Sequence, residues 1–121
     1  MATYDFKFTD VRKDGTRFWF VNDKFHREDG PAILYPDGSE QWYLNGNPHR
    51  EDGPAIIHAD HSEVWYLNGE LHREDGPAVS YTTGLQEWYL NGKRHREDGP
   101  AILHLDGTVE WFLNGDKQHD K

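Results

Sequence analysis

The sequence contains no cysteine, one methionine and no long hydrophobic run. Without cysteine the chain can form neither a disulfide framework nor a thiolate metal site, and nothing in it demands an oxidising compartment. No apolar segment reaches the roughly 18 residues that a membrane-spanning helix requires. The first ten residues, MATYDFKFTD, have neither the basic start nor the apolar centre of a secretion signal. We therefore expect a cytoplasmic protein with no membrane contact.

Basic residues are also scarce. The 13 Lys and Arg residues are outnumbered by 22 Asp and Glu residues, which gives a net charge of −9. Such a chain is a poor direct ligand for nucleic acid, and anionic lipid surfaces would repel it. Only 35% of the residues are hydrophobic, yet 14% are aromatic. That aromatic content is too high for a typical disordered chain, so the protein should fold.

An internal repeat dominates the sequence. Its tryptophans are each 23 residues from the next, at Trp19, Trp42, Trp65, Trp88 and Trp111. Seven residues after each of the first four, the heptapeptide HREDGPA begins. The period predicts one repeat domain over residues 1–121, because stacked units share a continuous core. Its expected parts are a degenerate N-terminal unit at about 1–26, regular repeats at about 27–49, 50–72, 73–95 and 96–118, and a short C-terminal tail at 119–121.

Each unit predicts two short strands, such as residues 31–35 and 39–44, with an Asp-Gly turn between them and an Asn-Gly turn after them. Both dipeptides favour type I′ turns, which suit antiparallel strands. The predicted fold is therefore all-β: an elongated, single-sheet β-meander, or solenoid-like array, of about five 23-residue β-hairpin repeats. Side-chain alternation puts each tryptophan on one face and the aromatic residue that follows it on the other.

The repeat frame resembles the MORN repeat, with the pattern WYLNGKxHxxxGxAxxxxDGxxxW over nearly the whole chain. It departs from MORN because Arg follows each histidine and Glu-Asp precedes the glycine. The HREDGPA version is similar to repeats in uncharacterised proteins of tailed bacteriophages and bacteria. The resemblance implies a non-enzymatic, protein-binding scaffold without a cofactor. It also implies a phage-encoded accessory protein that binds or inhibits a host factor, such as a defence system, in the host cytoplasm.

The HRED motif combines a general base, a cation and two carboxylates. Catalysis needs one such constellation in one pocket, whereas this motif recurs in four equivalent positions. We interpret it as a structural loop in which the aspartates bond turn amides and the arginines pair with carboxylates. A metal site is disfavoured, because two strands would separate neighbouring histidines by about 10 Å. The loop residues are His26, Arg27, Asp29, His49, Arg50, Asp52, His72, Arg73, Asp75, His95, Arg96 and Asp98.

The aromatic face, which lies opposite the tryptophans, is the expected partner surface. Tyrosine is enriched at protein interfaces, and first-strand positions on this face vary between units and could encode specificity. The alternative that these aromatics only cover a thin core stays open. The partner-binding candidates are Tyr35, Tyr43, His58, Tyr66, Tyr81, Tyr89, His104 and Phe112.

Two other functions also remain open. A small ligand, such as a nucleotide, a sugar or a choline-like cation, could stack on the aromatic ladder. Alternatively, the regular carboxylates could imitate DNA phosphates and occupy a nucleic-acid-binding protein. Unpaired edge strands would in addition allow homo-oligomers to form end to end.

Overall fold

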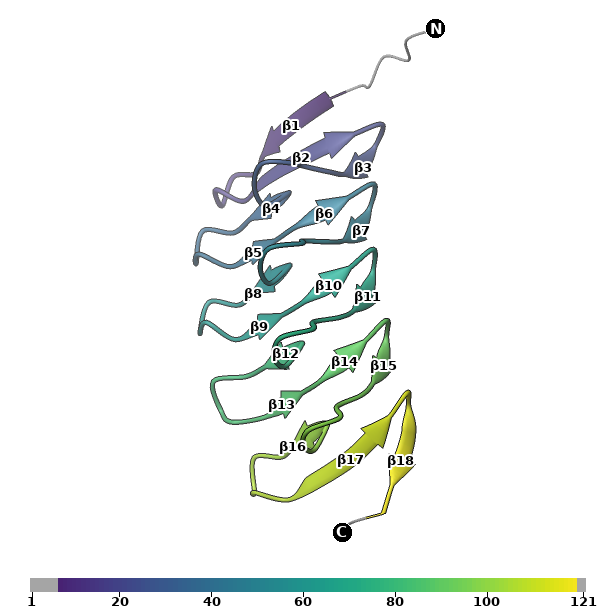
Figure 1. The fold of residues 1–121 in the computed structure, drawn as a ribbon. Helices are drawn as coiled ribbons and strands as arrows, with labels where there is room; N and C mark the ends of the chain where they lie inside the picture. The colour runs from purple at the N-terminus through teal and green to yellow at the C-terminus, as the bar shows by residue number, and fades with distance from the viewer. Residues whose placement is uncertain (1–6, 120–121) are drawn as a thin grey trace, which may run out of the picture.

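The computed structural model describes residues 7–119, and all of its regular structure is β-strand (Figure 1). This confirms the predicted all-β array. One antiparallel sheet of 12 strands runs the length of an elongated molecule, and successive units follow one another along it. Residues 1–6 of the expected N-terminal unit and residues 120–121 of the tail lie outside the described residues.

The main sheet receives two strands from each regular interior unit and three from each of the first and last units, and its strands follow their order in the chain. The degenerate first unit supplies the longest pairing, with five residues on each side. The strands of this sheet are β1 (Lys7–Val11), β2 (Arg17–Val21), β3 (Lys24–Phe25), β4 (Ile33–Leu34), β5 (Glu40–Gln41), β8 (Ile56–Ile57), β9 (Glu63–Val64), β12 (Val79–Ser80), β13 (Gln86–Glu87), β16 (Ile102–Leu103), β17 (Val109–Leu113) and β18 (Asp116–Gln118).

Three short hairpins lie beside the main sheet as separate two-stranded sheets. The second strand of a regular unit passes from the main sheet to a hairpin at its tryptophan. The Trp42 amide donates to the Ala55 carbonyl of the next unit, whereas the Trp42 carbonyl accepts the amide of His49, the residue that follows the hairpin. The hairpins pair β6 (Tyr43–Leu44) with β7 (Asn47–Pro48), β10 (Tyr66–Leu67) with β11 (Glu70–Leu71), and β14 (Tyr89–Leu90) with β15 (Lys93–Arg94).

The two turns of a unit differ in conformation. Asn45 and Gly46 have φ angles of 51° and 81°, which confirms the type I′ turn, and the later Asn-Gly pairs repeat these values. The type I′ prediction is wrong for Asp37-Gly38, where only the glycine has a positive φ, of 91°. The Asp37 carboxylate there accepts the Ser39 amide at 2.8 Å, which holds the aspartate outside the left-handed region.

The core is thin, and every unit contributes buried apolar residues to it. The alanine of each HREDGPA segment is fully buried, and its carbonyl accepts a hydrogen bond from the backbone amide of the preceding unit's tryptophan. Further backbone bonds join successive hairpins, as from the Gly46 amide to the Phe25 carbonyl. Every unit is therefore anchored to the next one at both its sheet strands and its hairpin. The buried apolar residues are Phe18, Ala32, Ile33, Ala55, Val64, Ala78, Val79, Ala101, Ile102 and Phe112.

Candidate functional site

Each HRED loop is held by its arginine. The Arg50 guanidinium lies over the Trp42 ring, with Cζ 3.8 Å from the ring centroid. Its Nε donates to Asp52 Oδ1 at 3.3 Å, and its Nη1 donates to the Pro54 carbonyl at 3.2 Å. A Cβ on Gly53 would lie 2.8 Å from Arg50 Cζ, so the glycine leaves the space that the guanidinium fills. The loop is thus closed around a cation that stacks on an indole ring.

The same clamp recurs in all four loops. The guanidinium lies 3.8–4.1 Å from the indole centroid in each case. Each arginine also donates to the aspartate two residues later and to the proline carbonyl four residues later. The structure thus puts the arginine–carboxylate pairing within one loop. We expected these aspartates to accept turn amides. Instead, each aspartate Oδ1 accepts a hydrogen bond from the arginine Nε of its own loop.

The histidines of the loops join neighbouring units. His26 Nδ1 accepts the Asn45 amide at 2.9 Å, so it caps the Asn-Gly turn of the next unit. The other three histidines make the same bond, 19 residues along the chain, at 2.8–2.9 Å. A ring nitrogen that accepts an N–H bond carries no proton, so the tautomer that makes this bond has its proton on Nε2. Sequence reasoning missed this role, because the partner lies in another repeat.

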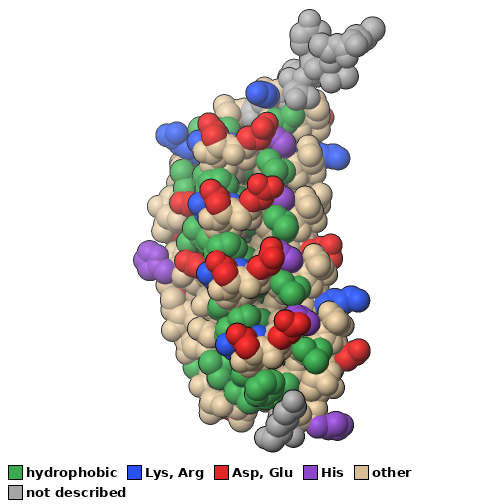
Figure 2. Space-filling view, viewed as in Figure 1, with side chains coloured by type: hydrophobic (Ala, Val, Ile, Leu, Met, Phe, Trp, Pro, Cys, Tyr) green, Lys and Arg blue, Asp and Glu red, His purple; other side chains and the backbone are tan. Residues whose placement is uncertain are grey.

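The two acids of each loop point into solvent. The glutamate side chains are 80–86% exposed and the aspartate side chains 82–90% exposed. Figure 2 shows the acid pairs as a column along one face of the array, which we call the loop face. It is formed by residues 26–29, 49–52, 72–75 and 95–98.

Clefts separate successive HRED loops on the loop face. The cleft between loops 50–52 and 72–75 has a volume of about 630 Å³ and is lined by Trp65 and Leu67 together with both loops. The equivalent cleft at Trp88 and Leu90 measures about 590 Å³, and the one at Trp42 and Leu44 about 360 Å³. Each combines an apolar indole and leucine with two guanidinium groups and a larger number of exposed carboxylates. The arrangement suits a ligand that is both apolar and positively charged.

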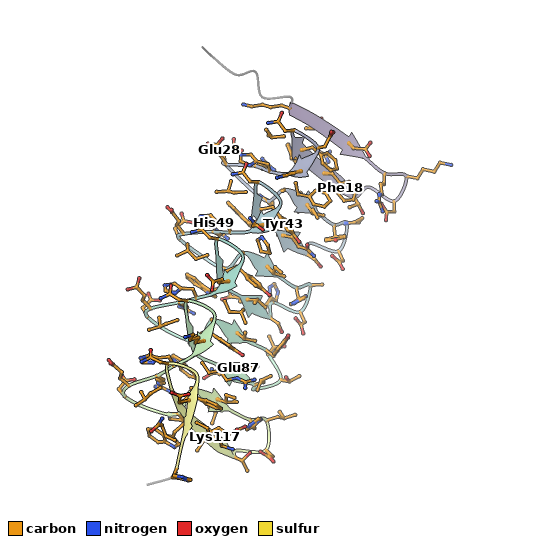
Figure 3. All side chains as sticks on the ribbon, turned by 90° about the vertical axis from the view of Figure 1, so that its right-hand side faces the viewer. Phe18, Glu28, Tyr43, His49, Glu87 and Lys117 are labelled. Atoms are coloured by element: carbon orange, nitrogen blue, oxygen red, sulfur yellow. The ribbon has the colours of Figure 1, made fainter. Side chains whose placement is uncertain are left out.

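The aromatic face is more enclosed than a free partner surface would be. Phe112 is buried in a cluster with Ala101 and Ile102, and Tyr43 packs against Phe25 with ring centroids 5.5 Å apart. Burial raises the pKa of Tyr43, and the nearby Tyr35 and Tyr66 raise it further. Figure 3 shows Phe18 and Tyr43 toward the side of the array opposite Glu28 and His49.

The variable first-strand candidates are the more open ones. His58 and Tyr81 are exposed and stack with ring centroids 6.3 Å apart, whereas Tyr35 and His104 are half-buried. His104 Nε2 lies 2.6 Å from Glu110 Oε2. Of the other candidates, Tyr66 and Tyr89 are half-buried, like Tyr43. The structure therefore does not bring the eight candidates together as one exposed surface.

Metal-ligating side chains do not gather in groups of three or more anywhere in residues 7–119. Nor does this part of the chain contain a helix long and apolar enough to cross a membrane. No protein-family model, curated protein or solved structure matches the chain. The function has to be inferred from the geometry of the loop face.

Proposed function

We propose that the chain is a non-enzymatic, protein-binding repeat scaffold whose loop face docks a positively charged partner. The observation that carries the proposal is the recurrence of one cleft between successive HRED loops, with an indole, a leucine and more carboxylates than guanidinium groups. A repeated surface of this kind is typical of repeat proteins that bind extended partners. The loop face replaces the aromatic face as the proposed interface, because much of the aromatic face is packed against neighbouring side chains.

The charge of the loops supports a basic partner. With a neutral histidine, each loop has one arginine against one glutamate and one aspartate, so the four loops carry −4 of the chain's −9. The arginine is already bonded to the aspartate, as between Arg73 and Asp75 at 2.9 Å. The glutamate is thus the main source of uncompensated charge in each cleft, where complementary charge guides association.

The bonding of the HRED residues supports a binding role over catalysis. A catalytic histidine needs a ring nitrogen that can exchange a proton with the substrate. Here Nδ1 accepts a backbone amide, Nε2 faces the glutamate of its own loop and the arginine is held by the loop, and this arrangement recurs four times instead of forming one site. We retain the phage-encoded inhibitor of a host factor as the biological role. A basic groove of a nucleic-acid-binding enzyme, filled by a DNA mimic, would be one partner of this kind.

The test compares two variants that each lose four acids. The loop-face variant carries Glu28→Gln, Glu51→Gln, Glu74→Gln and Glu97→Gln. Its control carries Asp10→Asn, Asp23→Asn, Glu70→Gln and Asp116→Asn, which are exposed acids outside the loop face. Both have the same net charge.

Each protein is immobilised on a solid support and incubated with a bacterial lysate. The lysate proteins that it retains are quantified by mass spectrometry. We expect a stoichiometric partner of the parent protein to remain on the control and to be lost from the loop-face variant. Retention by both variants would contradict the proposal. A third variant with Tyr43→Ser, Tyr66→Ser and Tyr89→Ser examines the aromatic face: if it stays folded and alone loses the partner, the interface lies there instead.

A further inference from the structure

We propose that the loop face binds an extended segment in polyproline II conformation with Lys or Arg at every third residue. This inference rests on the proposed function and names the class of its partner. It starts from the geometry of the sheet. Each regular unit adds two strands to the main sheet, as β4 and β5 are followed by β8 and β9. Strands in a sheet lie about 4.8 Å apart, so equivalent loop residues recur about every 9.6 Å.

The polyproline II helix has nearly the same period. It rises about 3.1 Å per residue with three residues per turn, so every third side chain points the same way at intervals of about 9.3 Å. Over three intervals the difference from the loop spacing accumulates to only about 1 Å. An extended β-strand presents same-side residues at about 6.6 or 13 Å, and neither value matches. An α-helix repeats after seven residues at about 10.5 Å and drifts by about 3 Å over the column.

The clefts also suit the chemistry of such a segment. Aromatic-lined grooves are the usual receptors for polyproline II segments, and each cleft has an indole and a leucine side by side, as at Trp65 and Leu67. The aliphatic stem of a lysine can lie on this apolar lining while its ammonium group reaches a carboxylate. Prolines between the basic residues would fill the clefts without needing hydrogen-bond partners for an N–H group.

The glutamates supply the carboxylates. Glu28, Glu51, Glu74 and Glu97 lie 3.5–4.0 Å from a histidine Nε2 of their own loop. The tautomer that accepts the backbone amide at Nδ1 brings no positive charge to this contact, and the glutamate side chains are 80–86% exposed, so they remain available to a cationic partner. The carboxylates stand in a column on one face, as Figure 2 shows, so one straight segment can meet all four.

Two synthetic peptides of identical composition test the register. Both contain four lysines and eight prolines and so have the same charge and the same conformational preference. One repeats Lys-Pro-Pro, and the other places its lysines in two adjacent pairs separated by prolines. Binding to the full chain is measured by isothermal titration at low and at physiological salt.

We expect the Lys-Pro-Pro peptide to bind about tenfold more tightly than its isomer, since only it can engage the four glutamates together. Its affinity should fall as salt is added. The loop-face variant should lose this binding, and the four-acid control should retain it within about threefold, because only long-range attraction is altered.

Equal binding of the two isomers would overturn the register while leaving an acidic docking face in place. Binding of neither isomer would overturn the inference as a whole. If the loop-face variant then still releases the partner captured from lysate, the proposed function survives and its partner is a folded basic surface. If the captured partner is indifferent to the loop-face substitutions, the proposed function fails as well.

Discussion

Aromatic rings fill the N-terminal end of the face opposite the loops, whereas at its C-terminal end charged groups replace two of the three rings and only Phe112 stays aromatic. Phe18 stacks against Phe20 and Phe25, with ring centroids 6.1 and 5.8 Å away. Its counterpart in the last unit is Glu110, which contacts His104 Nε2 at 2.6 Å and Lys117 Nζ at 3.2 Å. The backbone frame is the same, so the repeat sets the strand positions without fixing what packs between them.

The unit before the last shows the intermediate chemistry. Glu87, again one residue before a tryptophan, accepts the Tyr89 hydroxyl at 2.9 Å, and Arg94 Nε donates to that hydroxyl at 3.2 Å. Burial, followed by the bond to Glu87, raises the pKa of Tyr89. On the loop face, by contrast, all four units use one set of contacts. We therefore expect equivalent substitutions on the loop face to lower stability equally in all four units, and equivalent substitutions on the opposite face to have different effects from unit to unit.

The largest expected effect is that of Phe18→Ala. Phe18 is buried and stacks on two rings, so its truncation should lower the free energy of unfolding by about 3 kcal/mol. Glu110→Ala at the equivalent position should have a clearly smaller effect, because an accessible ion pair contributes little. Urea unfolding followed by fluorescence and by circular dichroism measures both variants. Equal losses at the two ends would remove the contrast.

Arg50→Ala should have the next largest effect, a loss of about 2 kcal/mol, since it removes an indole contact and two hydrogen bonds. Arg27→Ala, Arg73→Ala and Arg96→Ala should give similar losses, because their contacts are the same. Arg50→Lys is the control and should restore little, as an ammonium group cannot reproduce the planar fork. Chemical unfolding of the four alanine variants checks the uniformity. A spread as wide as that on the opposite face would disprove it.

His49→Ala is expected to weaken the junction between two units by about 1 kcal/mol, since the Asn68 amide loses its acceptor. Hydrogen exchange should accelerate at the Asn68 amide more than elsewhere. His58→Ala, an exposed histidine of the variable positions, is the control and should leave that amide unchanged. Nitrogen chemical shifts of the parent should also report the proton on Nε2 of His49. A proton on Nδ1 would refute the assigned bond.

The smallest effect concerns acid. The bond from His104, together with that from Lys117, lowers the pKa of Glu110 below its ordinary value of 4.5. A carboxylate with a lowered pKa in the folded state stabilises the protein above its unfolded pKa, and this contribution is lost as pH falls through the folded value. Glu110→Gln should therefore flatten the stability profile in that acidic range. Phe18→Ala should keep the acid dependence of the parent. Unfolding midpoints measured from neutral pH to pH 3 would contradict this if both profiles coincide.

Much of the fold could be predicted because the repeat encodes it locally. The tryptophan period located the units, and Asn45-Gly46 located a turn, since both residues adopt positive φ readily. The Asp37-Gly38 turn was harder, because an aspartate side chain that bonds a following amide favours another turn with the same two residues. The site was harder still. The identity of the HRED residues in four units indicated a structural loop, but the clefts form only once two loops stand side by side.

The sequence by itself determined the period, the all-β class and the presence of a repeated loop, because turn preferences and side-chain alternation act within a few residues. Only the tertiary structure decided how units join. The stacking of neighbouring units brings His26 next to Asn45, and it also forms the cleft beside Trp42. It also decided which face is filled and which is open. Phe112 is buried while the adjacent Leu113 is 40% exposed, since packing against the next element, rather than residue type, determines what remains accessible.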